Sequence, residues 1–369
     1  MLSATLAALA AAASAACTNE DAAPPVEPVP DPLDSEVTTD GPFAAGYRTI
    51  ETSYESPGGL GERTLTLNLW YPTEEPGGPT PVYSKLFVDD DVFVDAPLAR
   101  PAYPDGFPVL AHSHGFRGYG GNSAELMRHF ATHGWVVVAP DHKDNTLLDA
   151  LDPLPLSHYF HRPLDIRASL DAIATLPEHD PLAGGVDLTR VAMSGHSFGT
   201  FTTWACAGAT FARASIEAAC KSGGKLADAG CTDALVDVFE TELSEPRVRA
   251  AIPMAGGARP DFFANGGYDS VGVPVLLMTG GDDTVDGKAL FEQVGEQLDF
   301  TWVDVAGGCH QLFGFGDCEN IANDVGFPIV SGFALAFARR HVLGDDDARV
   351  AAIVDGTDTV SDLVSFAKK

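Results

Sequence analysis

A serine between two glycines is the first feature of this sequence that could do chemistry. The stretch G-H-S-F-G at 195–199 follows the apolar run 190–194 and precedes a segment with helical spacing. A serine at a tight strand-to-helix turn needs small residues two places to either side, because the backbone is crowded there. The N-terminus of the following helix also directs N–H groups towards developing negative charge. The pattern therefore predicts that Ser197 is a nucleophile.

A serine nucleophile needs an imidazole that takes its proton and a carboxylate that orients the imidazole. His310 and His341 are the two histidines that follow Ser197 in the chain. His341 lies in a basic, helix-like stretch, whereas His310 follows the apolar run 300–305 in a glycine-rich loop. We therefore assign the base to His310. His196 adjoins the serine and is expected to point away from it and to pack.

Three aspartates compete for the role of the carboxylate. Asp282, Asp283 and Asp286 follow the apolar run 273–278 and precede His310. This placement agrees with the chain order serine, acid, histidine that is known for one large class of hydrolases. Aspartates in such loops also bind their own backbone in turns. The residues themselves therefore leave the choice open.

The elements around these residues predict an α/β fold. Strand-like and helix-like segments alternate over 46–345, which indicates one domain with a mostly parallel sheet flanked by helices. Segments 47–55 and 62–71 surround a glycine-rich turn and predict an antiparallel hairpin. The further expected strands are 107–111, 135–139, 190–194, 248–254, 273–278 and 300–305, and the expected helices are 123–132, 164–176 and 198–209.

Two segments depart from this alternation. Residues 210–246 interrupt it after the expected helix that follows Ser197, and we interpret them as an insertion that caps the site; a plain surface excursion is the alternative. Residues 346–369 carry no visible chemistry and are expected to form a peripheral, helical C-terminal segment.

The N-terminus indicates export. Residues 1–16 are small and apolar, are too short to span a bilayer comfortably, and end in a run suited to signal cleavage, although the usual basic start is missing. The residues before Cys17 resemble a bacterial lipobox, so we expect a lipid anchor and membrane tether at Cys17; a simple secretory signal is the alternative. Residues 17–45 are rich in proline and acidic residues, which is typical of an extended linker.

The charge of the chain limits its partners. Acidic residues outnumber basic ones by 52 to 22, which gives a formal net charge of −30. Such a surface repels nucleic acid and anionic lipid headgroups. We therefore expect no nucleic-acid partner.

The cysteines suggest disulfides in an oxidising compartment. Of six cysteines, five remain if Cys17 is lipidated, so one thiol stays unpaired. The shortest loops to close are Cys220 with Cys231 and Cys309 with Cys318. Cys206 is then free, although four cysteines allow other connectivities.

With these features in place, the chain from about 47 to 343 resembles the α/β-hydrolase superfamily, in its dienelactone-hydrolase-like and platelet-activating-factor acetylhydrolase-like branch. The matching stretches are HSHGFRG (112–118), APDHKDN (139–145), GHSFG (195–199), GGDDTV (280–285) and GGCHQLFG (307–314). The resemblance implies the α/β-hydrolase fold and hydrolysis of short-acyl or lipid-like carboxylic esters through an acyl-enzyme, without cofactor or metal. The family pattern G-x-x-D implies Asp283 as the acid. It also implies the backbone N–H groups of Phe116 and Phe198 as oxyanion donors.

Several other functions remain open. Bacterial polyester hydrolases of the cutinase and PET-degrading type are more distantly similar, but their aromatic clamp includes a tryptophan where this sequence has small residues at 255–257. Amide or peptide hydrolysis would use the same triad, and a non-catalytic surface binding protein could keep the same fold. His112, His114, Asp141 and His142 could also be interpreted as zinc ligands. We expect these histidines to form hydrogen bonds instead.

Overall fold

The computed structural model describes residues 28–222, 226, 230–264, 266–316 and 318–369. The expected signal segment 1–16 and the expected lipidation site Cys17 lie outside the described residues. Within the described part of the chain, no helix is both long and apolar enough to cross a membrane.

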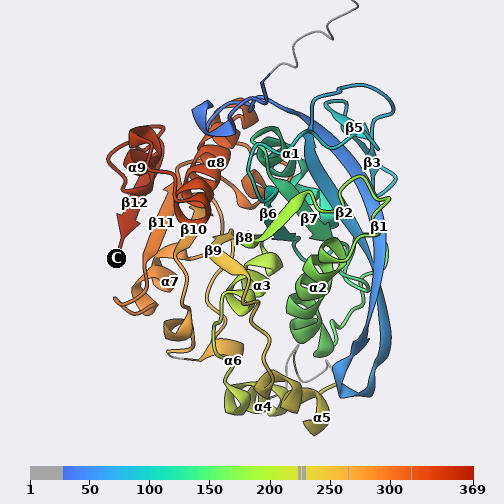
Figure 1. Cartoon of the computed structure of the whole chain (residues 1–369). Coiled ribbons are helices and arrows are strands. Elements are labelled where there is room, and N and C mark those ends of the chain that lie inside the picture. Colours follow the sequence, from blue (N-terminus) through green and yellow to red (C-terminus); the bar gives the residue numbers. More distant parts are fainter. Residues whose placement is uncertain (1–27, 223–225, 227–229, 265, 317) are drawn as a thin grey trace, which may run out of the picture.

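One large sheet organises the molecule (Figure 1). The strands are β1 (Ala44–Ser56), β2 (Gly61–Thr73), β3 (Val82–Tyr83), β4 (Phe87–Val88), β5 (Val92–Val94), β6 (Phe107–Ser113), β7 (Val136–Pro140), β8 (Val186–His196), β9 (Val248–Met254), β10 (Val275–Gly280), β11 (Phe300–Val305) and β12 (Val364–Lys368). Among the described residues, ten of them form a sheet in the order β12-β11-β10-β9-β8-β6-β7-β2-β1-β5, and β3 pairs with β4 separately. In this order, adjacent strands from β7 to β11 pair in parallel. Strand β2 pairs antiparallel with β7, and β12 pairs antiparallel with β11.

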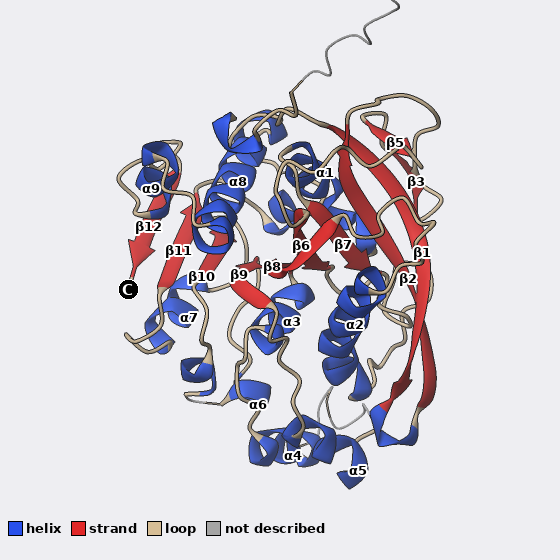
Figure 2. Ribbon diagram, viewed as in Figure 1, coloured by secondary structure: helices blue, strands red, loops and turns tan. Residues whose placement is uncertain are grey.

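The helices surround the central strands, as Figure 2 shows. They are α1 (Ala124–Thr132), α2 (Ser157–Ala174), α3 (Phe198–Cys206), α4 (Arg213–Lys221), α5 (Asp233–Val236), α6 (Pro260–Phe263), α7 (Gly287–Gln293), α8 (Asn323–Ala338) and α9 (Ala348–Val354). Helices α1 and α8 pack into one hydrophobic layer, and α2 packs into another. The predicted α/β class, with a mostly parallel sheet flanked by helices, is thereby confirmed.

The central strands are apolar throughout because both of their faces are covered. In β6, Val109 and Ala111 pack into the layer with α2, whereas Leu110 between them packs into the layer with α1 and α8. In β7, Val136 and Val137 divide between the two layers in the same way. This double burial explains why continuous apolar runs in the sequence predicted these strands correctly.

Helix α2 begins earlier than the sequence predicted. It starts at Ser157 rather than near residue 164. Its first half carries buried polar side chains, among them His161, Arg162 and Asp165. Because these residues are polar, the apolar spacing that marks a helix in the sequence is absent there.

Both ends of the described chain pack onto the domain. Residues 28–43, expected as part of an extended linker, bury Val37 and Phe43, and the Val37 carbonyl accepts a hydrogen bond from His129 Nε2 at 2.9 Å. At the other end, the segment expected as a peripheral helix forms α9 and then β12, which extends the sheet beside β11. The strand was missed because it is short and half-exposed, so its sequence lacks a clear apolar run.

We predict that Arg339 holds the N-terminal segment on the domain. Its buried guanidinium donates to Asp345 at 2.7 Å and to the carbonyls of Leu33 and Ser35. Arg339→Gln leaves the buried Asp345 carboxylate without its ionic partner, so the free energy of unfolding should fall by about 2–4 kcal/mol in urea titrations of the full chain. The matched control is Arg340→Gln, because Arg340 is 40% exposed and should change it by less than about 0.5 kcal/mol. Equal effects of the two substitutions would contradict this role.

Candidate active site

Ser197 lies in a strained turn between β8 and α3. Strand β8 ends at His196 and α3 begins at Phe198, and Ser197 itself has φ 56° and ψ −113°. A Cβ at Gly199 would lie 1.8 Å from the Ser113 carbonyl oxygen, and a Cβ at Gly195 would lie 2.3 Å from the Gly199 carbonyl oxygen. Glycine is therefore required at both positions, and the turn presents the serine side chain at the carboxyl end of the sheet.

The structure brings Ser197, His310 and Asp283 into one hydrogen-bonded chain. His310 Nε2 lies 2.8 Å from Ser197 Oγ, and His310 Nδ1 lies 2.7 Å from Asp283 Oδ2. His310 follows β11 and Asp283 follows β10, so neighbouring parallel strands deliver both side chains to the same edge. The Asp283 side chain is 2% exposed and that of His310 is 36% exposed. The imidazole thus connects a buried carboxylate with a serine that opens to solvent.

The other two aspartates of the loop have structural partners. Asp282 Oδ2 accepts a hydrogen bond from Asn320 Nδ2 at 2.7 Å, and Asp286 Oδ1 caps α7 by accepting from the Ala289 N–H at 2.8 Å. The structure therefore separates three carboxylates that the residue pattern alone did not distinguish.

His196 contacts the loop that carries the candidate base His310. The sequence did not predict this contact. Its Nε2 lies 2.9 Å from the His310 carbonyl oxygen, and the two rings lie 4.9 Å apart. Burial lowers the pKa of His196 to about 4, so the ring is neutral at neutral pH and Nε2–H donates to the carbonyl. His196 thus fixes the backbone at His310, and no spacing signal in the sequence pointed to a contact over 114 positions.

The two expected disulfides are present. Cys220 bonds to Cys231 and Cys309 bonds to Cys318, while Cys206 is free and buried. The second bond brackets the candidate base, because Cys309 immediately precedes it in the chain. Two disulfides are typical of proteins that fold in an oxidising, extracytoplasmic environment.

The segments of the two expected oxyanion donors adjoin Ser197. A Cβ at Gly115 would lie 3.1 Å from Ser197 Cβ, so the loop before Phe116 passes directly by the serine. Phe198 is the first residue of α3. Among the described residues, no acceptor is bound to the backbone N–H of Phe116 or of Phe198.

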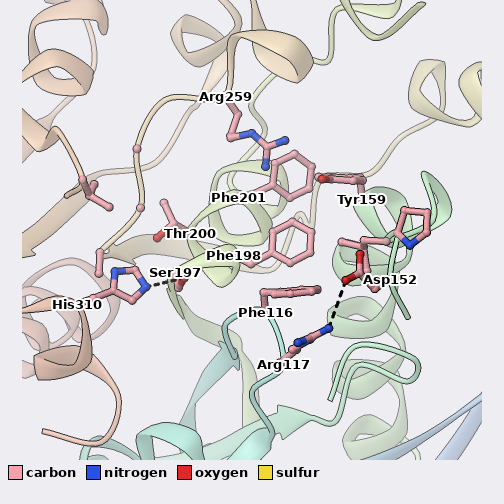
Figure 3. A pocket seen from close by; sticks show the side chains of 16 residues that line it. Phe116, Arg117, Asp152, Tyr159, Ser197, Phe198, Thr200, Phe201, Arg259 and His310 are labelled. Carbon is pink, nitrogen blue, oxygen red and sulfur yellow. Dashed lines mark hydrogen bonds and ion pairs between the residues drawn. The ribbon is translucent and has the colours of Figure 1, made fainter. Parts of the chain in front are cut away.

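Ser197 opens into a cavity of about 760 Å³, which Figure 3 shows from close by. Its lining residues are Phe116, Arg117, Asp152, Pro153, Leu154, Tyr159, Ser197, Phe198, Thr200, Phe201, Ala255, Gly256, Gly257, Arg259, Val285 and His310. The rings of Phe116, Tyr159, Phe198 and Phe201 form an aromatic wall beside Ser197 (Figure 3). The Arg259 guanidinium lies over the rings of Tyr159 and Phe201 at 5.2 and 5.7 Å and pairs with Asp261 at 2.9 Å. The cavity is suited to an apolar group next to the serine.

The described part of the insertion 210–246 does not confirm the expected cap. None of its described residues lines the cavity. Phe211 contacts the ring of Phe201 at 6.0 Å and Phe239 contacts that of Phe262 at 5.7 Å, so the insertion packs behind the aromatic wall. Residues 152–154, which precede α2, line the cavity instead.

The histidines that could be interpreted as zinc ligands form hydrogen bonds. His112 Nδ1 lies 2.9 Å from Ser194 Oγ, and His114 Nδ1 donates to the Gly115 carbonyl at 2.7 Å. The Asp141 carboxylate accepts from the Gly120 N–H at 2.7 Å. Within the described ranges, no group of three or more His, Cys, Asp or Glu side chains is arranged to hold a metal ion.

A second serine–histidine–aspartate chain lies beneath the site. Ser113 Oγ is 2.9 Å from His142 Nε2, and His142 Nδ1 is 2.8 Å from Asp165 Oδ2. All three side chains are buried, and none of them lines the cavity. Burial lowers the pKa of His142 to about 3, so its ring is neutral and links the serine and the carboxylate as a structural bridge. Exposure therefore distinguishes the two chains, and only that of Ser197 meets the cavity.

Comparisons with known proteins do not identify a family for this chain. No protein-family model matches the chain, and no curated protein matches it.

We predict that the carboxylate of Asp283 controls the reactivity of Ser197. In Asp283→Asn the amide cannot hold the reactive tautomer of His310, so labelling of Ser197 by a fluorophosphonate should slow by about 10³–10⁴-fold. Asp282→Asn is the matched control and should be labelled at the wild-type rate. The rate is followed by intact mass, and peptide mapping locates the adduct. An Asp282 variant as slow as the Asp283 variant would reject the assignment.

Proposed function

We propose that the protein is an exported serine hydrolase of the α/β-hydrolase fold that cleaves carboxylic esters through an acyl-enzyme on Ser197. The observation that carries the proposal is the chain Asp283–His310–Ser197, which ends in a cavity with an apolar wall. Short-acyl or lipid-like esters are the proposed substrates, as the resemblance to the dienelactone-hydrolase-like and platelet-activating-factor acetylhydrolase-like branch implies.

The proposed reaction has two halves. As Ser197 Oγ attacks the ester carbonyl carbon, His310 Nε2 accepts its proton, and the carbonyl oxygen becomes an oxyanion between the N–H groups of Phe116 and Phe198. The C–O bond to the leaving group then breaks, and His310 returns the proton to the departing alcohol. Water next attacks the acyl-enzyme and loses a proton to His310, and the acid leaves as Ser197 regains its proton. Throughout, Asp283 accepts the Nδ1–H of His310 and keeps the ring in the required tautomer.

The cavity favours small esters over polyesters. Phe116 lies at its rim, but Ala255, Gly256 and Gly257 line the position where the second clamp residue of polyester hydrolases would be. A Cβ at Gly256 would lie 2.3 Å from Thr200 Cβ, so this position has no room for a large ring without displacement of α3. Polyester and amide hydrolysis are therefore secondary outcomes of the test below.

Export and anchoring belong to the same proposal. The apolar segment 1–16 would direct the chain to the envelope, and a lipid on Cys17 would tether the domain to the membrane. The two disulfides support folding in an oxidising compartment.

We predict hydrolysis of p-nitrophenyl esters by the purified full-length chain. In a panel from acetyl to palmitoyl, turnover should persist in the presence of a chelator, and Ser197→Ala should reduce kcat by about 10⁶-fold. The dependence on chain length reports how much of the cavity the acyl group fills. Turnover that survives in Ser197→Ala would contradict the assignment, and a wild type that cleaves only anilides would indicate an amide hydrolase.

A further inference from the structure

Arg162 is a fully buried cation whose hydrogen-bond partners are all neutral. It lies in α2, and its Nε donates to Thr202 Oγ1 at 3.1 Å. Its Nη1 donates to Asn145 Oδ1 at 2.6 Å, and its Nη2 donates to Ser113 Oγ at 3.1 Å and to the His114 carbonyl. Within the described residues, no carboxylate forms a salt bridge with Arg162. Burial of a charge without an ionic partner lowers the stability of the fold, so the position of Arg162 suggests a role beyond packing.

The side chain of Arg162 joins the two segments that would supply the oxyanion donors. Its bond to the His114 carbonyl holds the residue that follows β6, two residues before Phe116. Its guanidinium lies 4.3 Å from the centre of the Phe198 ring, and its bond to Thr202 reaches the next turn of α3. Thus one rigid, planar group contacts both the loop of the first donor and the helix of the second.

Among the described buried groups below the site, the two guanidiniums of Arg63 and Arg162 face the single carboxylate of Asp165. Burial first raises the pKa of Asp165, but the Arg63 guanidinium at 2.8 Å holds it well below its usual range, so Asp165 is ionised and paired with Arg63. Asp144 approaches Arg63 only at 3.9 Å and is 38% exposed. Burial lowers the pKa of Arg162 to about 9, which still leaves it protonated at neutral pH.

The histidines around Arg162 do not change this balance of charges. Burial lowers the pKa of His112 to about 3, and it lowers that of His114 well below the usual range. Both rings are therefore neutral near neutral pH. Since a buried site screens charge less than bulk water does, the charge of Arg162 acts on the proposed oxyanion position more strongly than a surface charge would.

We propose that Arg162 is the positioning residue of the oxyanion site. It fixes the loop of Phe116 and the first turn of α3 relative to each other, and it supplies a buried positive charge that favours the negatively charged tetrahedral intermediate. This inference rests on the proposed function, and it assigns a role to a side chain that does not touch the substrate.

The test compares Arg162→Lys, Thr202→Val and a control in the same helix, Arg167→Met. Lysine keeps the charge but cannot make the four hydrogen bonds or lie flat on Phe198, so kcat for p-nitrophenyl acetate should fall about 10²-fold with KM nearly unchanged. Thr202→Val removes one bond to α3 and should lower kcat by about 3–10-fold. Arg167 binds the carbonyls of Glu242 and Ser244 away from the cavity, so Arg167→Met should retain wild-type kcat.

A boronic acid provides a readout that general loosening of the structure would not move. When an alkyl boronic acid forms a bond from boron to Ser197 Oγ, His310 takes the hydroxyl proton, and the anionic tetrahedral adduct directs one of its oxygens to the proposed oxyanion position. Its inhibition constant should rise by the same factor as kcat falls in Arg162→Lys and Thr202→Val, while that of a neutral aliphatic alcohol should stay constant.

The outcomes separate the two proposals. Wild-type chain that neither turns over the ester nor binds the boronic acid would defeat the proposed function. Active wild type, together with folded Arg162→Lys and Thr202→Val variants that keep kcat and boronic-acid affinity, would overturn the role of Arg162. If Arg162→Lys does not fold, as judged by circular dichroism, Thr202→Val decides alone.

Discussion

Ser197 occupies a backbone conformation that an L-residue rarely adopts, and the neighbouring strands hold the turn in that conformation. The positive φ at this turn costs of the order of 1–3 kcal/mol, so the neighbouring structure must stabilise it. The Ser197 N–H donates to the Met254 carbonyl at 2.9 Å, which anchors the turn to β9. On the other side, Gly199 lets α3 approach the end of β6. The turn therefore depends on three neighbouring parallel strands and not on local sequence alone.

Beneath the turn, buried polar side chains form a layer. Ser113, His142, Asp165, Arg63 and Arg162 form its centre, and they are connected by the hydrogen bonds described above. Tyr54 extends the layer to the hairpin, because its hydroxyl donates to Asp165 at 2.8 Å. Such a network is stable only when its members satisfy one another, so it holds the loops above it in a single arrangement. The proposed backbone donors of Phe116 and Phe198 would need such a fixed arrangement.

Much of the fold could be predicted from the sequence because buried parallel strands leave continuous apolar runs, and the glycines around Ser197 leave a sharp local pattern. The choice of Asp283 over Asp282 needed the family pattern, since both aspartates sit in the same loop and differ only in direction. The first half of α2 could not be predicted, because His161, Arg162 and Asp165 turn polar side chains into the core. The bond from His196 to the His310 carbonyl and the packing of Phe211 and Phe239 behind the aromatic wall arise from tertiary contacts that no local pattern encodes.

The most direct test of the account is the capture of the acyl-enzyme. When the full-length chain is mixed with p-nitrophenyl acetate and quenched in acid within the first turnover, intact-mass spectrometry should show the addition of one acetyl group. Peptide mapping should place this group on Ser197. Turnover without an acylated serine, or an acetyl group on another residue, would contradict nucleophilic catalysis by Ser197.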